Sequence, residues 1–206
     1  MKWHTEYRIV ELFESLQGEG YNTGMPAVFI RLGKCNLACR WCDTPYNRFK
    51  MLSLEQIIDQ VTSFQSKNII ITGGEPTIQP DLPLLLQELK KLNYFLAIET
   101  NGIKPVPTEI DYIAVSPKRV YEKIYQTKGI KYADEVRIVV DGDISHFCHL
   151  IEKKIKASNY YLSPCEEGEV MNLGYTIKQL SLLNQRKNAL THWQLSLQTH
   201  KLAGIR

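Results

Sequence analysis

The sequence of 206 residues lacks the features that mark several large classes of protein. It has no internal repeat and no low-complexity tract. None of its apolar runs approaches the roughly 20 residues that a helix needs to cross a bilayer. The segment Met1–Glu6 lacks the apolar core of a signal peptide. We therefore expect a single soluble domain over residues 1–206, with no membrane partner.

The sequence also has little net charge and no even set of cysteines. Its 25 basic and 22 acidic residues leave a charge of +3, without the clustered basic excess of a nucleic-acid-binding surface, so we expect no direct nucleic-acid partner. Five cysteines cannot all pair, and three of them stand close together. This argues against a disulfide scaffold and favours a reducing, cytoplasmic location.

Short apolar and β-branched runs recur along the chain and predict buried strands. They lie at residues 27–32, 68–72, 94–99, 112–115, 136–140, 160–162 and 193–197. Between them, Ser53–Gln56 has the spacing of a capping box, and further helices are expected from Asp81 onward and over 144–156. Strands that alternate with helices predict an α/β fold, in which a parallel sheet with helices outside closes into a full or partial (β/α) barrel.

Cys35, Cys39 and Cys42 form a Cys-x3-Cys-x2-Cys motif after the first of these strands. A [4Fe–4S] cluster has four irons and is usually held by four thiolates, so three thiolates leave one iron open to a small molecule. Structural zinc is the alternative, but it takes four protein ligands, and no second cysteine pair follows here. The spacing therefore favours an iron–sulfur cluster with an open iron.

Polar residues also follow other predicted strands. Thr72–Pro76 reads Thr-Gly-Gly-Glu-Pro, in which the glycines allow close approach to a ligand and Glu75 could hold an ammonium group. Ser116 could bond a ribose hydroxyl, and Lys118 could pair with a carboxylate. Because the carboxyl ends of parallel strands share one edge of the sheet, these motifs predict a ligand site beside the cysteine loop. Alone, each would suit an ordinary turn.

In this order, the motifs resemble the radical S-adenosylmethionine (SAM) superfamily. A closer similarity to the 7-carboxy-7-deazaguanine synthase family extends over nearly the whole chain. It is carried by Glu11–Gly20, Gly24–Leu32, Trp41–Thr44, Ile71–Pro76, Ser116–Lys118 and Leu197–Lys201. The resemblance implies an abbreviated radical SAM core, a partial (β/α) barrel, with an N-terminal substrate-binding segment and a C-terminal tail over the active site. It also implies a homodimer.

For function, the resemblance implies a carbon–nitrogen lyase. Such an enzyme converts 6-carboxy-5,6,7,8-tetrahydropterin into 7-carboxy-7-deazaguanine with release of ammonia, toward queuosine in tRNA. Its cofactors would be a [4Fe–4S] cluster, SAM and Mg²⁺, and a reductant such as flavodoxin or ferredoxin would supply electrons. Another small radical SAM enzyme, such as a glycyl-radical activase, is the first alternative, against which Gln17–Gly20 and the tail motif argue. A non-enzymatic iron–sulfur module would leave the strand-end motifs without a purpose.

The resemblance also assigns site residues by position. Cys35, Cys39 and Cys42 would hold the cluster, and Thr44 would contact Mg²⁺. The implied SAM contacts are Trp41, Cys42, Asp43, Gly74, Glu75, Ser116, Pro117, Lys118, Ser163, Pro164, Cys165 and Glu166. The implied substrate contacts are Leu16, Gln17, Gly18, Glu19, Arg31, Thr72, His200 and Arg206.

Several of these residues also have ordinary interpretations. Trp41 and Cys165 could be core side chains, Arg31 could form a surface ion pair, and His200 could be a surface histidine. Ser163 stands where the family commonly has a glutamine, which is a longer hydrogen-bonding side chain. In the tail, we expect Leu202 and Ile205 to bury apolar surface, because chain ends usually fray unless something ties them down.

The cysteine spacing makes a direct prediction. Anaerobic reconstitution should give about four irons and four sulfides per chain, as a cubane cluster requires. Replacing Cys35, Cys39 or Cys42 by alanine should abolish both the cluster and SAM cleavage. Cys148→Ala should leave both nearly unchanged, because Cys148 lies in a predicted helix as a small core residue. Iron and sulfide analysis of the variants checks this, and loss of the cluster from the Cys148 variant would contradict it.

Overall fold

The computed structural model describes residues 5–167, 170–187 and 191–205. Its strands are β1 (Glu6–Leu16), β2 (Pro26–Leu32), β3 (Lys50–Ser53), β4 (Asn68–Gly73), β5 (Phe95–Thr100), β6 (Tyr112–Val115), β7 (Tyr132–Val140), β8 (Lys156–Pro164), β9 (Glu166–Glu167), β10 (Val170–Met171) and β11 (Trp193–Leu195). Its helices are α1 (Leu54–Thr62), α2 (Leu82–Lys91), α3 (Glu122–Thr127), α4 (Ser145–Lys154), α5 (Leu173–Asn184) and α6 (Thr199–Ala203), with short 3-10 turns η2 (Pro76–Ile78) and η3 (Arg119–Tyr121).

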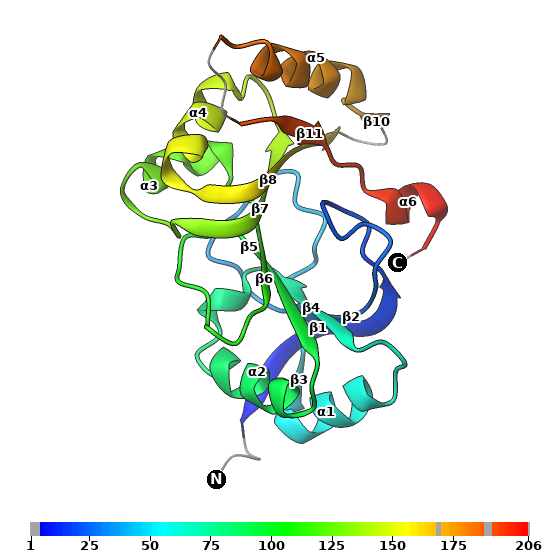
Figure 1. Cartoon of the computed structure of the whole chain (residues 1–206). Helices are drawn as coiled ribbons and strands as arrows, with labels where there is room; N and C mark the ends of the chain where they lie inside the picture. Colours follow the sequence, from blue (N-terminus) through cyan, green and yellow to red (C-terminus); the bar gives the residue numbers. More distant parts are fainter. Residues whose placement is uncertain (1–4, 168–169, 188–190, 206) are drawn as a thin grey trace.

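Nine strands form one curved sheet in the order β11-β8-β7-β6-β5-β4-β2-β1-β3 (Figure 1). From β11 to β2 neighbouring strands run parallel, while β1 pairs antiparallel with both β2 and β3. All seven strands expected from the sequence are present, as β2, β4 to β8 and β11. The sheet has two free ends, so the partial barrel is confirmed and full closure is not.

The predicted helices are also present, and α1 begins as its sequence indicates. The Ser53 hydroxyl accepts a hydrogen bond from the Gln56 amide at 3.2 Å, and the Ser53 amide donates to the Gln56 side chain at 2.9 Å. These two bonds complete the capping box. The helix expected over 144–156 is α4, which is shorter at both ends because β8 begins at Lys156.

The sequence interpretation missed the antiparallel strands β1 and β3 and the helices α3, α5 and α6. The first half of β1 alternates, with Tyr7 and Ile9 buried in the outer core between more exposed neighbours, and beyond an irregularity between Ile9 and Glu11 the strand buries Phe13 on the inner face. Such alternation is typical of a strand with one covered face, whereas the expected strands were continuous apolar runs. The missed elements belong to the ends of the sheet and to its outer layer.

Alternation along the parallel strands separates an apolar outer face from a partly polar inner face. Outward residues such as Ile69 and Ile71 of β4 pack under α1 and α2, and those of β7 and β8 pack under α3, α4 and α5. Inside, a small cluster includes Phe13 and Phe29, whose stacked rings are 5.1 Å apart. The helices therefore cover one face only, and the other face can carry a site.

The inner face is where the polar side chains of the strand ends gather. Arg31 of β2 is paired in register with Thr72 of β4, and Thr72 donates a 2.8 Å hydrogen bond to Glu99 of β5. Arg137 of β7 and Ser163 of β8 continue the same face, because Ile138 and Leu162 beside them pack in the outer core. A period of two thus aligns five polar residues from five strands.

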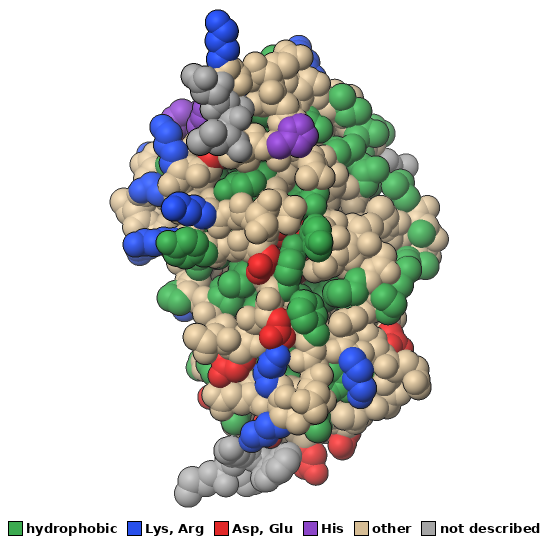
Figure 2. All heavy atoms as spheres, viewed as in Figure 1, with side chains coloured by type: hydrophobic (Ala, Val, Ile, Leu, Met, Phe, Trp, Pro, Cys, Tyr) green, Lys and Arg blue, Asp and Glu red, His purple; other side chains and the backbone are tan. Residues whose placement is uncertain are grey.

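The outer surface is uneven in charge (Figure 2). In the described residues, no helix is long and apolar enough to cross a membrane. Lysine and arginine side chains gather on one side of the face shown in Figure 2, beside α3 and α4. A groove of about 320 Å³ there is lined by Lys128, Lys131, Lys153, Lys154 and Lys156, among others. None of the predicted site residues lines this groove.

Candidate functional site

A cavity of about 830 Å³ opens at the carboxyl ends of the parallel strands. It brings together most of the predicted site residues from distant parts of the sequence. Those that line it are Leu16, Gln17, Gly18, Glu19, Arg31, Cys35, Cys39, Trp41, Cys42, Asp43, Thr44, Thr72, Gly74, Ser116, Lys118, Ser163, Pro164, Cys165, Glu166 and His200. The size is that of a site for small molecules, and its position agrees with the expected edge of the sheet.

Among the described residues, two predicted ones do not line the cavity. Glu75 is fully buried behind the wall, where its carboxylate accepts hydrogen bonds from the Thr100 hydroxyl and the Asn101 amide, each at 2.7 Å, as well as from Thr77. It therefore fixes the ends of β4 and β5, and the expectation that it faces an ammonium group is not met in this arrangement. Pro117 is buried and does not line the cavity. Arg206 lies outside the described residues.

Gly73, the last residue of β4, and Gly74 after it allow the loop that follows β4 to pack against the cysteine loop. A Cβ atom on Gly74 would lie 2.0 Å from the Lys34 carbonyl oxygen, and one on Gly73 would lie 2.1 Å from the Leu32 carbonyl oxygen. Gly73 also has a positive φ of 131°, which larger residues rarely adopt. The Glu75 amide donates to the Lys34 carbonyl at 2.9 Å. Without side chains, Gly73 and Gly74 let the loop after β4 and the cysteine loop pack together, and they leave the cavity wall unobstructed at this point.

The cysteine loop is held by three further contacts from neighbouring strand ends. The Asn101 side chain donates to Asn36 at 2.8 Å, and the Ala38 amide donates to the Tyr121 hydroxyl at 2.9 Å. The Trp41 indole N–H points toward Asp141, with 3.4 Å between Nε1 and Oδ2. These contacts tie the cysteine loop to the residues that follow β5, β6 and β7.

Lys118 lies over the Trp41 ring, with Nζ 4.9 Å from the ring centroid, and donates to the Ser116 hydroxyl at 2.7 Å. Burial lowers the pKa of Lys118, and the neighbouring thiols and Glu19 oppose that shift. Trp41 therefore packs against a cation at the cavity wall and is more than a core side chain.

Cys35, Cys39 and Cys42 are free thiols on the same cavity wall, a donor set that suits an iron–sulfur cluster. Burial raises the pKa of Cys35 and of Cys39. Within residues 5–167, 170–187 and 191–205, no three cysteine, histidine or acidic side chains stand together as a preformed metal site. The suitability of this site for an iron–sulfur cluster therefore rests on the chemistry of the three thiols and on the cavity that they share.

Arg137 is the buried cation of the cavity, and three carboxylates surround it. Its terminal nitrogens donate to Glu99 at 2.7 Å and to Glu19 at 3.0 Å. Its Nε lies 2.8 Å from a Glu135 oxygen, but the N–H is not directed at that oxygen, so this contact is an ion pair without a hydrogen bond. The guanidinium thereby links β5, β7 and the loop between β1 and β2.

Glu99 is ionised because of this arrangement. Burial alone would raise its pKa, but the Arg137 charge and the hydrogen bonds from Arg137, Thr72 and Gln17 outweigh it and lower the pKa to about 2. A carboxylate at the cavity wall can accept hydrogen bonds from a ligand. In the sequence, Glu99 is only the last residue of the predicted strand 94–99, and no motif gives it a role.

The loop of Gln17–Tyr21 lies over the inner face and is fixed from several sides. The Gln17 side chain donates to Glu99 at 3.1 Å and accepts from the Glu19 amide at 3.1 Å. The Tyr21 amide donates to Glu135 at 2.8 Å. Since each end of the Gln17 amide makes one hydrogen bond within the protein, this side chain positions the loop and keeps one N–H and one lone pair for a ligand.

The C-terminal tail packs on this loop through polar contacts. The amide and hydroxyl of Thr199 both donate to the Gly18 carbonyl at 2.9 Å. A Cβ atom on Gly18 would lie 2.0 Å from the His200 ring, so only glycine permits this approach. Leu202 and Ile205 remain 65% and 43% exposed, and the expectation that they bury apolar surface is therefore wrong. Hydrogen bonds hold the tail instead.

Arg31 forms an ion pair and also lines the cavity, so it has features of both the surface ion pair and the substrate contact considered from the sequence. Its Nε pairs with Glu11 at 2.7 Å, and both side chains line the cavity. In the described part of the chain, no partner engages its two terminal nitrogens. Glu11 therefore orients a guanidinium fork whose outer edge is available to a carboxylate.

Ser163 is a second residue with unused hydrogen-bonding capacity. It is only 4% exposed, lines the cavity, and its hydroxyl has no partner among the residues that the structure describes. Buried polar groups are usually satisfied, so a ligand atom is the natural partner. Cys165 beside it is 2% exposed and also lines the cavity.

Sequence reasoning missed several functional positions of the site. Arg137 lies within the otherwise apolar run 136–140, and an arginine in such a run is a detectable signal, because a buried charge needs partners. Glu11, Gln198 and Lys201 also line the cavity. They lay within recognised segments, but only the fold shows which way they face.

The comparisons with known proteins identify the family of the chain. Residues 29–126 match the Radical SAM superfamily. The chain is 63% identical to 7-carboxy-7-deazaguanine synthase from Haemophilus influenzae and 60% identical to that from Neisseria meningitidis serogroup B, each over 97% of this chain and 94% of the relative.

Solved structures agree in fold. The crystal structure of QueE from Escherichia coli matches with a TM-score of 0.69 and 27% identity, covering 94% of each chain. SuiB from Streptococcus suis, bound to its precursor peptide SuiA, matches with a TM-score of 0.54 over 81% of this chain and 47% of its own. At 14% identity, that second likeness concerns the fold alone.

The lowered pKa of Glu99 predicts how stability depends on pH. A depressed carboxyl pKa stabilises the fold fully above its usual value of 4.5, and this is lost as the pH falls toward about 2. Between these values the wild type should lose about 3 kcal/mol more free energy of unfolding than Glu99→Gln. Urea unfolding across this range measures it, with Glu6→Gln, an exposed position, as the control. Parallel curves for wild type and Glu99→Gln would contradict the assignment.

Proposed function

The chain belongs to the 7-carboxy-7-deazaguanine synthase family of radical SAM enzymes, and we propose that the cavity described above carries out its reaction. The reaction converts 6-carboxy-5,6,7,8-tetrahydropterin into 7-carboxy-7-deazaguanine and releases ammonia. One observation carries the proposal: a single cavity joins three free thiols to the Gln17–Tyr21 loop and to α6. A glycyl-radical activase would account for the thiols but not for these two segments.

On one side of the cavity, the three cysteines would hold the cluster and neighbouring segments would hold SAM. When bound, the cluster supplies one electron and SAM supplies the carbon radical that removes a hydrogen from the pterin. Trp41, Asp43, Gly74 and the strand-end residues Ser116 and Lys118 line this side. So do Ser163, Pro164, Cys165 and Glu166. The unpartnered Ser163 hydroxyl supports a SAM contact there, although serine is shorter than the glutamine common in the family.

On the other side, the pterin would meet ionised and oriented groups. The pyrimidinone ring carries N–H donors, which suit the Glu99 carboxylate at the wall. Leu16 and Gly18 would contribute backbone groups, and Gln17 would contribute the second N–H and the second lone pair of its side-chain amide. His200 on α6 lies against Gly18 and would cover the ligand.

At the same side, Arg31 would bind the carboxylate of the pterin. Its terminal nitrogens are unengaged in the described residues, and Glu11 fixes the direction of the guanidinium. A planar fork matches a carboxylate with two parallel hydrogen bonds. Thr72, the register partner of Arg31, lies beside it and is oriented by Glu99.

Magnesium, the electron donor and the assembly state are further parts of this proposal. Thr44 lines the cavity close to the cysteine loop and would contribute a hydroxyl to Mg²⁺, with the substrate carboxylate and waters completing the shell. A reductant such as flavodoxin or ferredoxin would deliver electrons. Exposed apolar residues of α5, among them Ile177 and Leu182, support a homodimer.

Anaerobic turnover by the reconstituted enzyme tests the function. With SAM, reductant and the carboxylated pterin, the wild type should form 7-carboxy-7-deazaguanine and one ammonia per pterin. Arg31→Lys should weaken pterin binding by roughly 2–5 kcal/mol, because lysine cannot reproduce a bidentate contact, while SAM binding stays unchanged. Product analysis and equilibrium titration measure these effects.

A tetrahydropterin that lacks the 6-carboxylate is the matched control ligand. It should bind wild type and Arg31→Lys with similar affinity, since the contact that the variant loses is absent from it. Equal affinity of both proteins for the carboxylated pterin would refute the role of Arg31. Absence of the deazaguanine product from the wild type would refute the function.

A further inference from the structure

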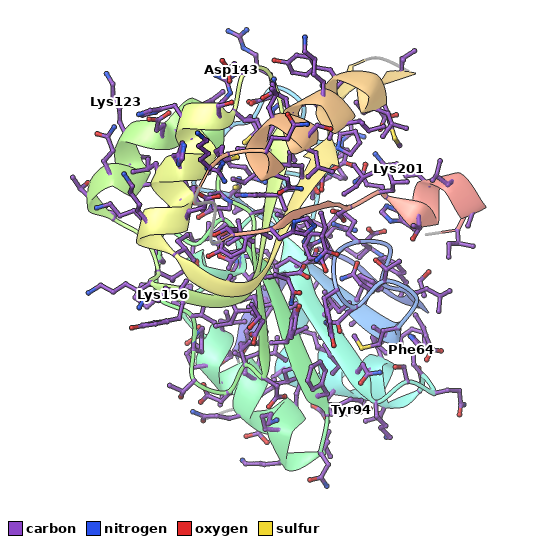
Figure 3. The ribbon with its side chains drawn as sticks, turned by 45° about the horizontal axis from the view of Figure 1, so that its top comes forward. Phe64, Tyr94, Lys123, Asp143, Lys156 and Lys201 are labelled. Atoms are coloured by element: carbon purple, nitrogen blue, oxygen red, sulfur yellow. The ribbon has the colours of Figure 1, made fainter. Side chains whose placement is uncertain are left out.

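Lys201 connects three segments that border the cavity. Its ammonium lies 2.7 Å from a Glu166 oxygen and 3.0 Å from an Asp43 oxygen. Asp43 belongs to the cysteine loop, Glu166 follows β8, and Lys201 belongs to α6, so residues far apart in the sequence meet at one cation. Figure 3 labels Lys201 beside α6, the short helix that follows β11 at the edge of the molecule in this view.

The same short helix holds the opposite side of the cavity. Thr199 donates twice to the Gly18 carbonyl, and the Gln198 side chain donates to Glu19 at 3.0 Å. Glu19 is in turn paired with Arg137. Within four residues, the tail therefore contacts both the loop assigned to the pterin and the segments assigned to SAM.

We propose that Lys201 is a positioning residue that couples SAM binding to pterin binding. This inference rests on the proposed function, because Asp43 and Glu166 are placed at the SAM side by it. Bound SAM would hold the segments of Asp43 and Glu166 in place. Their two carboxylates would then contact Lys201, and Lys201 would hold α6 over the pterin. By thermodynamic reciprocity, a bound pterin that holds α6 in place would favour SAM to the same degree.

The charge pattern favours coupling over an isolated surface ion pair. An exposed pair contributes little to stability, and Asp43 is 61% exposed. Here, however, one ammonium stands between two carboxylates from different segments. Without it, Asp43 and Glu166 repel each other, so the two segments and the tail lose a common anchor.

Equilibrium binding without turnover tests the inference. The reconstituted enzyme, with its cluster oxidised and no reductant, is titrated with carboxytetrahydropterin in the absence and presence of saturating SAM. For the wild type we expect SAM to tighten pterin binding about fivefold, at the lower end of typical coupling. For Lys201→Met, which keeps an extended side chain but no charge, we expect no tightening.

Lys90→Ala is the matched control. Lys90 lies 2.8 Å from Asp111 and is similarly exposed, but it is remote from the cavity lining. It should keep the full coupling. Raising the salt concentration should also reduce the coupling in the wild type but not in Lys201→Met, because partly exposed charges are screened.

A second readout keeps the inference testable if a variant binds poorly. Hydrogen exchange at the amides of Lys201 and Leu202, which donate to the Gln198 carbonyl, should slow on SAM binding in the wild type and not in Lys201→Met. Equal coupling in wild type and Lys201→Met, or no coupling in the wild type, would overturn the inference while leaving the function intact. Failure of the wild type to bind either ligand would instead refute the proposed function.

Discussion

The ion cluster around Arg137 is the interaction on which the rest of the site depends. One buried guanidinium contacts Glu19, Glu99 and Glu135, which come from a loop and two strands. Breaking a buried pair by removing one partner costs about 3–5 kcal/mol, because the remaining charges lose their compensation. The loop that roofs the inner face is therefore held by charge at the centre of the sheet. Gly20, with a φ of 68°, fits against Glu135 where a Cβ atom would clash.

This constraint explains how an incomplete barrel can carry an enclosed site. The sheet has open ends, so no strand closes it. The Gln17–Tyr21 loop and α6 cover the gap instead, joined to each other at Gly18 and to β7 through Arg137. Apolar packing lies almost entirely on the outer face, beneath the helices, which leaves the inner face free for charged groups. Fold stability and chemistry thus occupy opposite faces of one sheet.

The sequence predicts the parallel strands and the cavity wall well, for a physical reason. Strands buried on both faces are continuous apolar runs, and polar motifs at their carboxyl ends must meet at one edge. The antiparallel strand β1 was missed because polar residues interrupt its apolar ones. Residue type does not determine the direction of a side chain: the Glu75 carboxylate accepts hydrogen bonds behind the wall, and Leu202 faces outward. Arg137 and Glu19 are far apart in the sequence and meet only in the folded chain, so no local sequence pattern predicts their contact.

Amide hydrogen exchange of the roofing loop tests the central claim most directly. The Gly20 amide donates to Ser196 and the Tyr21 amide to Glu135, so both report on the loop. Arg137→Lys keeps a charge but cannot make the same set of contacts, and losing one charge-assisted bond costs about 1.5–3 kcal/mol. We expect exchange at these two amides to accelerate at least about tenfold while the Ile70 amide in β4 is unchanged. Unaltered exchange at Gly20 and Tyr21 in that variant would contradict the account.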